Sequence, residues 1–382
     1  MTSFPAYAKV PARRRVTGGR ALPTLGRMTT PQPRFALTDL ALPFVGAPMA
    51  GGPSSPALAA AVTEAGGLGF LAAGYRPAEG LREDVAAVRA LTGGPFGVNL
   101  FVPQAANTAA PATAPDPAVH LSVAAYREAL QETARHYGVE LPATDPADDD
   151  GWAAKLDAVE ELQVPVVSFT FGLPAAATFR RLAEAGTTTC VTVTSVAEAE
   201  ASVRAGADLL TVQGPAAGGH RGTHRTEDVP GEEPLAELVR AVRAAVGVPL
   251  VAAGGIASAA DAAAVRAAGA DAVQVGTLLL RTPEAGTPAA YREALVSGRY
   301  GGTAVTRAFS GRLARGVRNA FVDRYTNMAP AAYPQVNQLT RPIRAAAARA
   351  GDPEALALWA SPSFAAAPAV PAAEVVRRIV LD

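Results

Sequence analysis

The chain has 382 residues, which is enough for one large α/β barrel with extra segments or for two domains of ordinary size. Its 34 Lys and Arg residues balance 34 Asp and Glu residues, and this zero net charge argues against nucleic acid or an anionic membrane surface as the main partner. Cys190 is the only cysteine and the four histidines form no HExxH motif, so we expect a cytoplasmic protein without a disulfide or a metal site.

Residues 1–34 form a basic leader that contains seven Lys and Arg residues and no acidic residue. The segment has no periodic apolar pattern, and no apolar core follows its basic residues as a secretory signal would require. We therefore predict a disordered leader, or an upstream start codon with Met28 as an alternative start, rather than a targeting signal.

From Phe35 onward, short apolar runs alternate with helix-like segments. Parallel strands need a crossover between them, so this alternation predicts a parallel sheet. Eight strand candidates in roughly 235 residues predict a TIM (β/α)₈ barrel over residues 35–285, and a doubly wound open sheet is the alternative. The candidates lie at 44–49, 69–73, 96–101, 164–171, 188–194, 208–213, 249–253 and 272–277.

Two further segments interrupt or extend this series. Residues 104–163 are predicted as a helical insertion after the third strand, with a Pro-, Ala- and Thr-rich loop followed by helices at 120–137 and 152–162. After Thr277 the strand–helix pattern ends. Residues 286–382 are therefore predicted as a C-terminal helical cap, with helices near 291–296, 343–350, 353–360 and 372–379.

Residues 209–224, LLTVQGPAAGGHRGTH, contain the first candidate for a catalytic residue, His220. An apolar run of strand length ends in a glycine-rich turn that presents His220, and such turns build sites at the carboxyl edge of barrels. An imidazole with an ordinary pKa of about 6.5 can accept a proton at neutral pH. A loop-capping role is the alternative for His220, and a structural role is favoured for His224, His120 and His136.

Two consecutive strand candidates end in glycine, in VAAGGI at 251–256 and VQVGT at 273–277. Free backbone N–H groups at such turns favour an anion, and barrels bind phosphate in the loops after their last two strands. Plain turn glycines would explain either motif alone but not the pair. We therefore predict a phosphate cradle that includes Gly254, Gly255 and Gly276.

Polar or flexible side chains stand at the ends of three other strand candidates. Asn99 and Gln213 need hydrogen-bond partners in a buried strand, and either a neighbouring strand end or a heterocycle in the barrel mouth would supply them. Pro48 and Met49 pack either on a flat ligand or into the core.

Taken together, six motifs resemble the nitronate monooxygenase family, formerly called 2-nitropropane dioxygenases. They are APMAGG at 47–52, VNLF at 98–101, VSFTFG at 167–172, QGPAAGGHRG at 213–222, AAGGI at 252–256 and QVGT at 274–277. The segment FSGRLARGVRN at 309–319 also resembles a stretch that follows the barrel in that family. The ordered set is specific, whereas any one motif is not.

The resemblance implies a TIM barrel that binds FMN non-covalently and uses O₂ to oxidise alkyl nitronates, or nitroalkanes, to a carbonyl compound and nitrite. It also implies that His220 is the catalytic residue. The family usually has Glu where Ala216 or its neighbour Pro215 stands, which puts the loop's shape and a substrate contact in question. The implied cofactor contacts are Ala47, Pro48, Met49, Asn99, Gln213, Gly218, Gly254, Gly255, Gln274, Val275, Gly276 and Thr277.

Several alternatives stay open at this point. A flavin-dependent enoyl-acyl carrier protein reductase has a similar barrel and AGGH loop but needs NAD(P)H and an acyl channel, and a flavin-binding protein without turnover is the other candidate. Inosine monophosphate dehydrogenase is excluded, because it needs a loop cysteine and Cys190 lies on a predicted strand. His220 would orient an anionic substrate if protonated and abstract an α-proton if neutral.

A homodimer is left open, and the expected partners are a small nitronate and O₂.

Overall fold

Eight short runs of buried residues form eight parallel strands, and their outer edges meet to close a barrel. The hydrogen-bonded order is β1-β9-β8-β6-β5-β4-β3-β2, and a bridge between Val45 and Leu68 joins the two ends of this order. The TIM barrel prediction is confirmed, and the open-sheet alternative is wrong. The strands are β1 (Phe44–Gly46), β2 (Gly69–Ala72), β3 (Phe96–Phe101), β4 (Val166–Thr170), β5 (Thr188–Val193), β6 (Leu209–Gln213), β8 (Leu250–Ala253) and β9 (Ala272–Val275).

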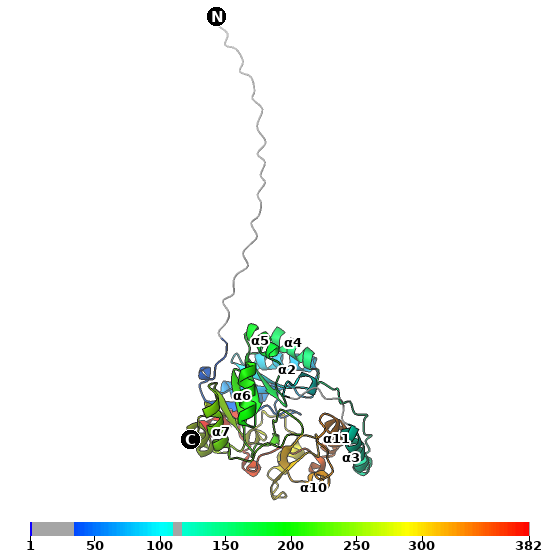
Figure 1. Ribbon diagram of the computed structural model, residues 1–382. Helices are drawn as coiled ribbons and strands as arrows, with labels where there is room; N and C mark the ends of the chain where they lie inside the picture. Colours follow the sequence, from blue (N-terminus) through cyan, green and yellow to red (C-terminus); the bar gives the residue numbers. More distant parts are fainter. Residues whose placement is uncertain (2–33, 110–116, 382) are drawn as a thin grey trace. The chain divides into compact units, whose positions relative to one another are not determined.

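The structure is a computed structural model that describes Met1 and residues 34–109 and 117–381 (Figure 1). The prediction of a disordered leader therefore lies almost wholly outside the described residues, as does the middle of the Pro-, Ala- and Thr-rich loop. No helix in the described ranges combines the length and the apolar character needed to cross a bilayer.

The inward-facing side chains change character from one end of the barrel to the other. Side chains alternate in direction along a strand, so every second residue points inward. Near the strand starts these residues are apolar and form one buried cluster that includes Val45, Phe70, Val166, Leu209 and Val251. Toward the carboxyl ends they become small or polar, at Ala72, Asn99, Thr170, Thr192, Gln213, Ala253 and Gln274, and all of these line a cavity.

Crossover helices cover the outside of the barrel, and serine caps start three of them. The side chains of Ser55, Ser195 and Ser258 each accept the N–H of the residue three positions on, which satisfies a donor that a helix start leaves free. These helices are α1 (Pro56–Glu64), α2 (Ala78–Leu91), α4 (Trp152–Glu161), α5 (Ala176–Glu184), α6 (Val196–Ala205), α7 (Leu235–Ala245) and α8 (Ala259–Ala267).

Within the inserted segment, α4 is itself the crossover helix between β3 and β4, since it packs on α2 and β3. The true addition is α3 (Pro117–His136) with its flanking loops. It packs on α11 (Gln335–Ala350) of the C-terminal region, and the two helices lie side by side in Figure 1.

The sequence pattern predicted a wholly helical C-terminal region. The structure differs, because this region also contains a β-hairpin. The strands β10 (Thr303–Thr306) and β11 (Ala314–Val317) pair antiparallel, and β11 also pairs with β7 (Gly219–His220). Two short helices, α9 (Ala289–Ala294) and α10 (Ala320–Tyr325), flank this sheet. The hairpin was missed because its two strands are only four residues long and are rich in Arg, Ala and Thr.

The helix that completes the ring around the barrel comes from the C-terminus. α12 (Ala372–Val380) packs between α1 and α8 and buries Val375, Val376 and Ile379. The side chain of Glu284, at the end of the barrel, accepts the first helical N–H from Ala372. The cap is therefore an excursion that leaves the barrel after β9 and returns to it.

We predict that α12 stabilises the barrel and not merely the cap. Ile379 is 2% exposed, so Ile379→Ala should lower the free energy of unfolding by about 2–5 kcal/mol because it leaves a cavity against α1 and α8. The measurement is urea unfolding followed by tryptophan fluorescence. Arg377→Ala, an exposed neighbour on the same helix, is the control, and equal stability of the two variants would contradict this role.

Candidate active site

A cavity of about 760 Å³ lies at the carboxyl ends of the barrel strands, within the range of small-molecule sites. All of the site residues predicted from the sequence line it. The cap also contributes to its wall, through residues that the sequence did not single out, including Ser310, Arg344, Trp359 and Ser361. The predicted residues that it brings together are His220, Ala47, Pro48, Met49, Asn99, Gln213, Gly218, Gly254, Gly255, Gln274, Val275, Gly276 and Thr277.

His220 is held in place by the hairpin of the cap. As part of β7 it pairs with Ala314 of β11, and Gly219 before it adopts a φ of 80°, which favours glycine. The His220 Nε2 atom lies 2.8 Å from Ser310 Oγ. Its ring is 5.2 Å, between centroids, from the rings of both Phe171 and Trp359. The imidazole orientation is therefore fixed by a hydroxyl and two aromatic side chains.

The environment of His220 keeps its imidazole neutral. Burial, followed by the positive charges of Arg312 and Arg344, lowers the pKa of His220 from its ordinary 6.5 to about 3. Each cause acts in the same direction, because both a dry surrounding and a nearby cation disfavour a second positive charge. At neutral pH the ring is therefore uncharged, with one nitrogen donating and the other accepting.

Arg312 is a buried cation and Arg344 a half-buried one, and neither has an acidic partner among the described residues. The Arg312 guanidinium donates to the carbonyl oxygens of Thr223 at 3.0 Å and Phe171 at 3.1 Å, and it stacks on the Phe171 ring at 4.4 Å. Arg344 donates to Asn337 Oδ1 at 2.6 Å. Neither forms an ion pair with any carboxylate of the described chain, and the Nε atom of each lacks a hydrogen-bond partner there. Arg344 lines the cavity and Arg312 packs behind the lining residue Phe171, so this side of the cavity has a positive potential.

The sequence contains a signal for these two arginines. Arg312 lies within the FSGRLARGVRN segment, where it interrupts small and apolar residues. On α11, Asn337, Thr340 and Arg344 follow one another at helical spacing, and the first two are buried. A polar stripe on the buried face of an amphipathic helix indicates a lined cavity rather than a core.

Tyr75 adds a strained residue to the same region. Its φ of 68° is uncommon for a residue other than glycine, and strain of this kind clusters at functional sites. Asp150 accepts the Tyr75 N–H at 3.0 Å, and Lys155 contacts the same carboxylate at 2.7 Å. The pair therefore fixes the Tyr75 backbone while the ring packs on Phe101.

Asn99 and Gln213 both have hydrogen-bond partners within the protein. Asn99 Nδ2 donates to Ser168 Oγ at 2.9 Å and Thr170 Oγ1 at 3.0 Å on the neighbouring strand. Gln213 Nε2 donates to the His220 carbonyl at 3.0 Å, and Gln213 Oε1 accepts the Gly222 N–H at 2.8 Å. Gln213 thus shapes the loop that carries His220, and a contact from either residue to a ligand stays a prediction.

The two glycine loops form a cradle with free donors. Gly254 and Gly255 have φ values of 111° and 80°, and a Cβ on Gly255 would lie 2.7 Å from the Ala216 Cβ. The backbone N–H groups at Gly255, Ile256, Gly276 and Thr277 donate to no acceptor among the described residues. Backbone donors of this kind fit the oxygens of a phosphate group.

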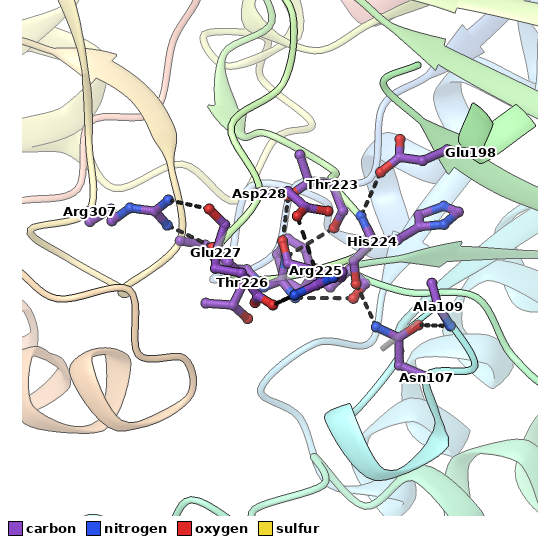
Figure 2. Close-up of polar contacts among 12 residues, drawn as sticks. Asn107, Ala109, Glu198, Thr223, His224, Arg225, Thr226, Glu227, Asp228 and Arg307 are labelled. Carbon is purple, nitrogen blue, oxygen red and sulfur yellow. Dashed lines mark hydrogen bonds and ion pairs between the residues drawn. The ribbon is translucent and has the colours of Figure 1, made fainter. Parts of the chain in front are cut away.

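Beside this site, the segment 223–228 forms hydrogen bonds with residues of the barrel, the insertion and the cap (Figure 2). His224 is buried, its N–H donates to Glu198 Oε1 at 2.8 Å, and its Nε2 lies 3.2 Å from the Thr192 carbonyl. Asn107 of the insertion donates to the His224 carbonyl, and Arg307 of the cap donates to the Thr226 carbonyl at 2.8 Å. His224 therefore has the structural role that the sequence analysis favoured.

Comparisons with known proteins agree on one family. A family model described as nitronate monooxygenase matches residues 34–382. A probable nitronate monooxygenase of Staphylococcus aureus strain MSSA476 is 35% identical over 351 residues, covering 90% of this chain and 95% of that protein.

Two solved structures share the architecture. A nitroalkane oxidase from Streptomyces ansochromogenes has 46% identity and a TM-score of 0.83, covering 90% of this chain and 96% of its own. FabK from Thermotoga maritima has 29% identity and a TM-score of 0.68, covering 90% of this chain and 93% of its own.

We predict that the His220 imidazole stays neutral to well below pH 6 and takes up a proton only near pH 3. In the unfolded chain a histidine takes up its proton near pH 6.5, whereas folded His220 does so only near pH 3. The contribution of His220 to the free energy of unfolding is therefore complete above pH 6.5 and declines as the pH falls toward 3, because the unfolded state then binds the proton more readily. Nuclear magnetic resonance of ¹⁵N-labelled histidine, with His220→Asn for assignment, measures the titration. A midpoint near 6.5 would contradict the described environment.

Proposed function

The chain belongs to the nitronate monooxygenase family and is a flavin-dependent oxidoreductase, and we propose that it binds FMN in the barrel mouth and oxidises alkyl nitronates with O₂ to a carbonyl compound and nitrite. One observation carries this proposal. A single cavity combines free phosphate donors, a neutral histidine and Arg344, and Arg312 lies behind the lining residue Phe171; neither arginine has an acidic partner among the described residues.

The residues of the cavity fit FMN. Backbone N–H groups at Gly255 and Gly276 would hold its phosphate, and Ala47, Pro48 and Met49 would pack against its ring system. The polar inward residues at the strand ends, Asn99 among them, would face the heteroatoms of the ring. When bound, the flavin supplies the redox chemistry, accepting electrons from the substrate and passing them to O₂.

The electrostatics of the cavity favour a preformed nitronate over a neutral nitroalkane. A histidine with a pKa of about 3 is a weak base, so it would abstract the α-proton of a nitroalkane inefficiently. The charges of Arg344, which lines the cavity, and of Arg312 behind it would attract an anion, because charges in a protein cavity are screened less than in bulk water. We therefore propose that His220, as a neutral hydrogen-bonding group, orients the nitronate, and that the two arginines balance its charge.

The assay for this function is nitrite release from an alkyl nitronate in air. We expect nitrite from the wild-type protein and a large loss of kcat/KM in His220→Asn, because the variant loses the group that orients the substrate. His120→Asn, on the exposed face of α3, is the matched control and should retain full activity. Equal activity of wild type and His220→Asn would remove His220 from the mechanism.

The same preparation separates the alternatives. Rapid anaerobic bleaching of the flavin by NADH without nitrite release would favour a reductase, which the FabK likeness keeps as a candidate. Bound flavin with neither response would favour a binding protein without turnover.

A second prediction tests the preference for anions. Arg344→Met should raise KM for a nitronate by roughly tenfold or more and change KM for the corresponding neutral nitroalkane much less, because only the anion loses an attraction. Arg344→Lys keeps the charge and should fall between Arg344→Met and wild type. Equal losses for the two substrates would contradict a charge-based role, and the measurement is steady-state kinetics above and below the pKa of the nitroalkane.

A further inference from the structure

We propose that Ser361, a residue of the cap, binds the phosphate group of the cofactor together with the two glycine loops of the barrel. This inference rests on the proposed use of FMN and concerns how the phosphate is recognised. It means that the C-terminal cap contacts the cofactor directly.

The segment 356–361 crosses the barrel mouth and is anchored on both sides. Trp359 forms a β-bridge with Gly316, and the Ala360 N–H donates to the Arg315 carbonyl at 3.3 Å. On the barrel side, the Ser361 N–H donates to Thr277 Oγ1 at 3.0 Å. Ser361 is therefore fixed against the end of β9 rather than carried on a free loop.

Ser361 also lies against Gly218, the glycine next to β7. A Cβ added to Gly218 would come within 2.6 Å of the Ser361 nitrogen and 2.5 Å of the Ala360 carbonyl carbon. Gly218 and Thr277 both line the cavity beside the phosphate cradle, as does Ser361 itself. The serine thus completes a wall that the barrel loops form in part.

The Ser361 hydroxyl is available to a ligand. The residue is only 5% exposed and lines the cavity, and the hydrogen bond that it makes with the described residues comes from its backbone N–H and not from its hydroxyl. A hydroxyl on the cavity wall without a protein partner can donate a hydrogen bond to a bound group. The free N–H groups of the cradle belong to residues that line the same cavity, and they are donors too.

A group that accepts several hydrogen bonds at once fits this set of donors. Asp84 is the one acidic side chain among the residues that line the cavity, and it pairs with Arg76. No carboxylate on the cradle itself therefore competes for the donors. A phosphate monoester, with three terminal oxygens, would engage the serine hydroxyl and the backbone N–H groups together.

The test compares FMN with riboflavin, which has the same ring but no phosphate. Each flavin is titrated into the flavin-free full-length protein, and binding is followed by quenching of flavin fluorescence. Ser361→Ala should raise the Kd for FMN about tenfold, because it removes one hydrogen bond to a charged group, and leave the Kd for riboflavin unchanged. Ser361→Thr, which keeps the hydroxyl, should retain the FMN preference.

Ser363→Ala is the matched control, since Ser363 lies two residues on and outside the cavity lining. It should change neither Kd. Equal weakening of both flavins in Ser361→Ala, or no change in either, would overturn the inference, and a thermal melt shows whether a variant has lost its fold. If the wild-type protein binds FMN no better than riboflavin, the inference about Ser361 is overturned but the proposed function stands. If the wild-type protein binds neither flavin, both the inference and the proposed function are refuted.

Discussion

Closure of eight parallel strands into a ring is the constraint on which the rest of the structure depends. It brings every strand's carboxyl end to one mouth, so that Asn99, Gln213 and Gln274 meet although they are far apart in the chain. The bridge between Val45 and Leu68 completes the ring. Because the inward residues near the strand starts are apolar, the opposite end is plugged and the cavity has a floor.

The cap turns this open mouth into a site of defined charge. Its hairpin pairs with the strand that carries His220, and its Ser310 lies within hydrogen-bonding distance of the imidazole. It also brings Arg312 and Arg344 close enough to lower the pKa of His220. Burial is the larger cause of the lowered His220 pKa, and the positive charges that add to it also favour an anionic ligand.

Much of the barrel could be predicted from local pattern, and the failures have definable causes. All eight predicted strands are present because each is a compact apolar run between helix-like segments. The hairpin at Thr303–Thr306 and Ala314–Val317 was missed because it is short and half polar, and it is stabilised by pairing with Gly219–His220. The place of α12 in the barrel could not be predicted, because an amphipathic helix does not specify the surface on which it packs.

The sequence by itself determined the strand series, the paired glycine loops and the position of His220 in a glycine-rich turn at a strand end, because periodicity and glycine act within a few residues. Only the tertiary structure decided the protonation of His220 and the composition of the cavity wall. Ser310 lies 90 residues from His220 in the chain, and Ser361 lies 84 residues from Thr277. Charge, burial and hydrogen-bond partners at such separations follow from how elements pack, and no local pattern records them.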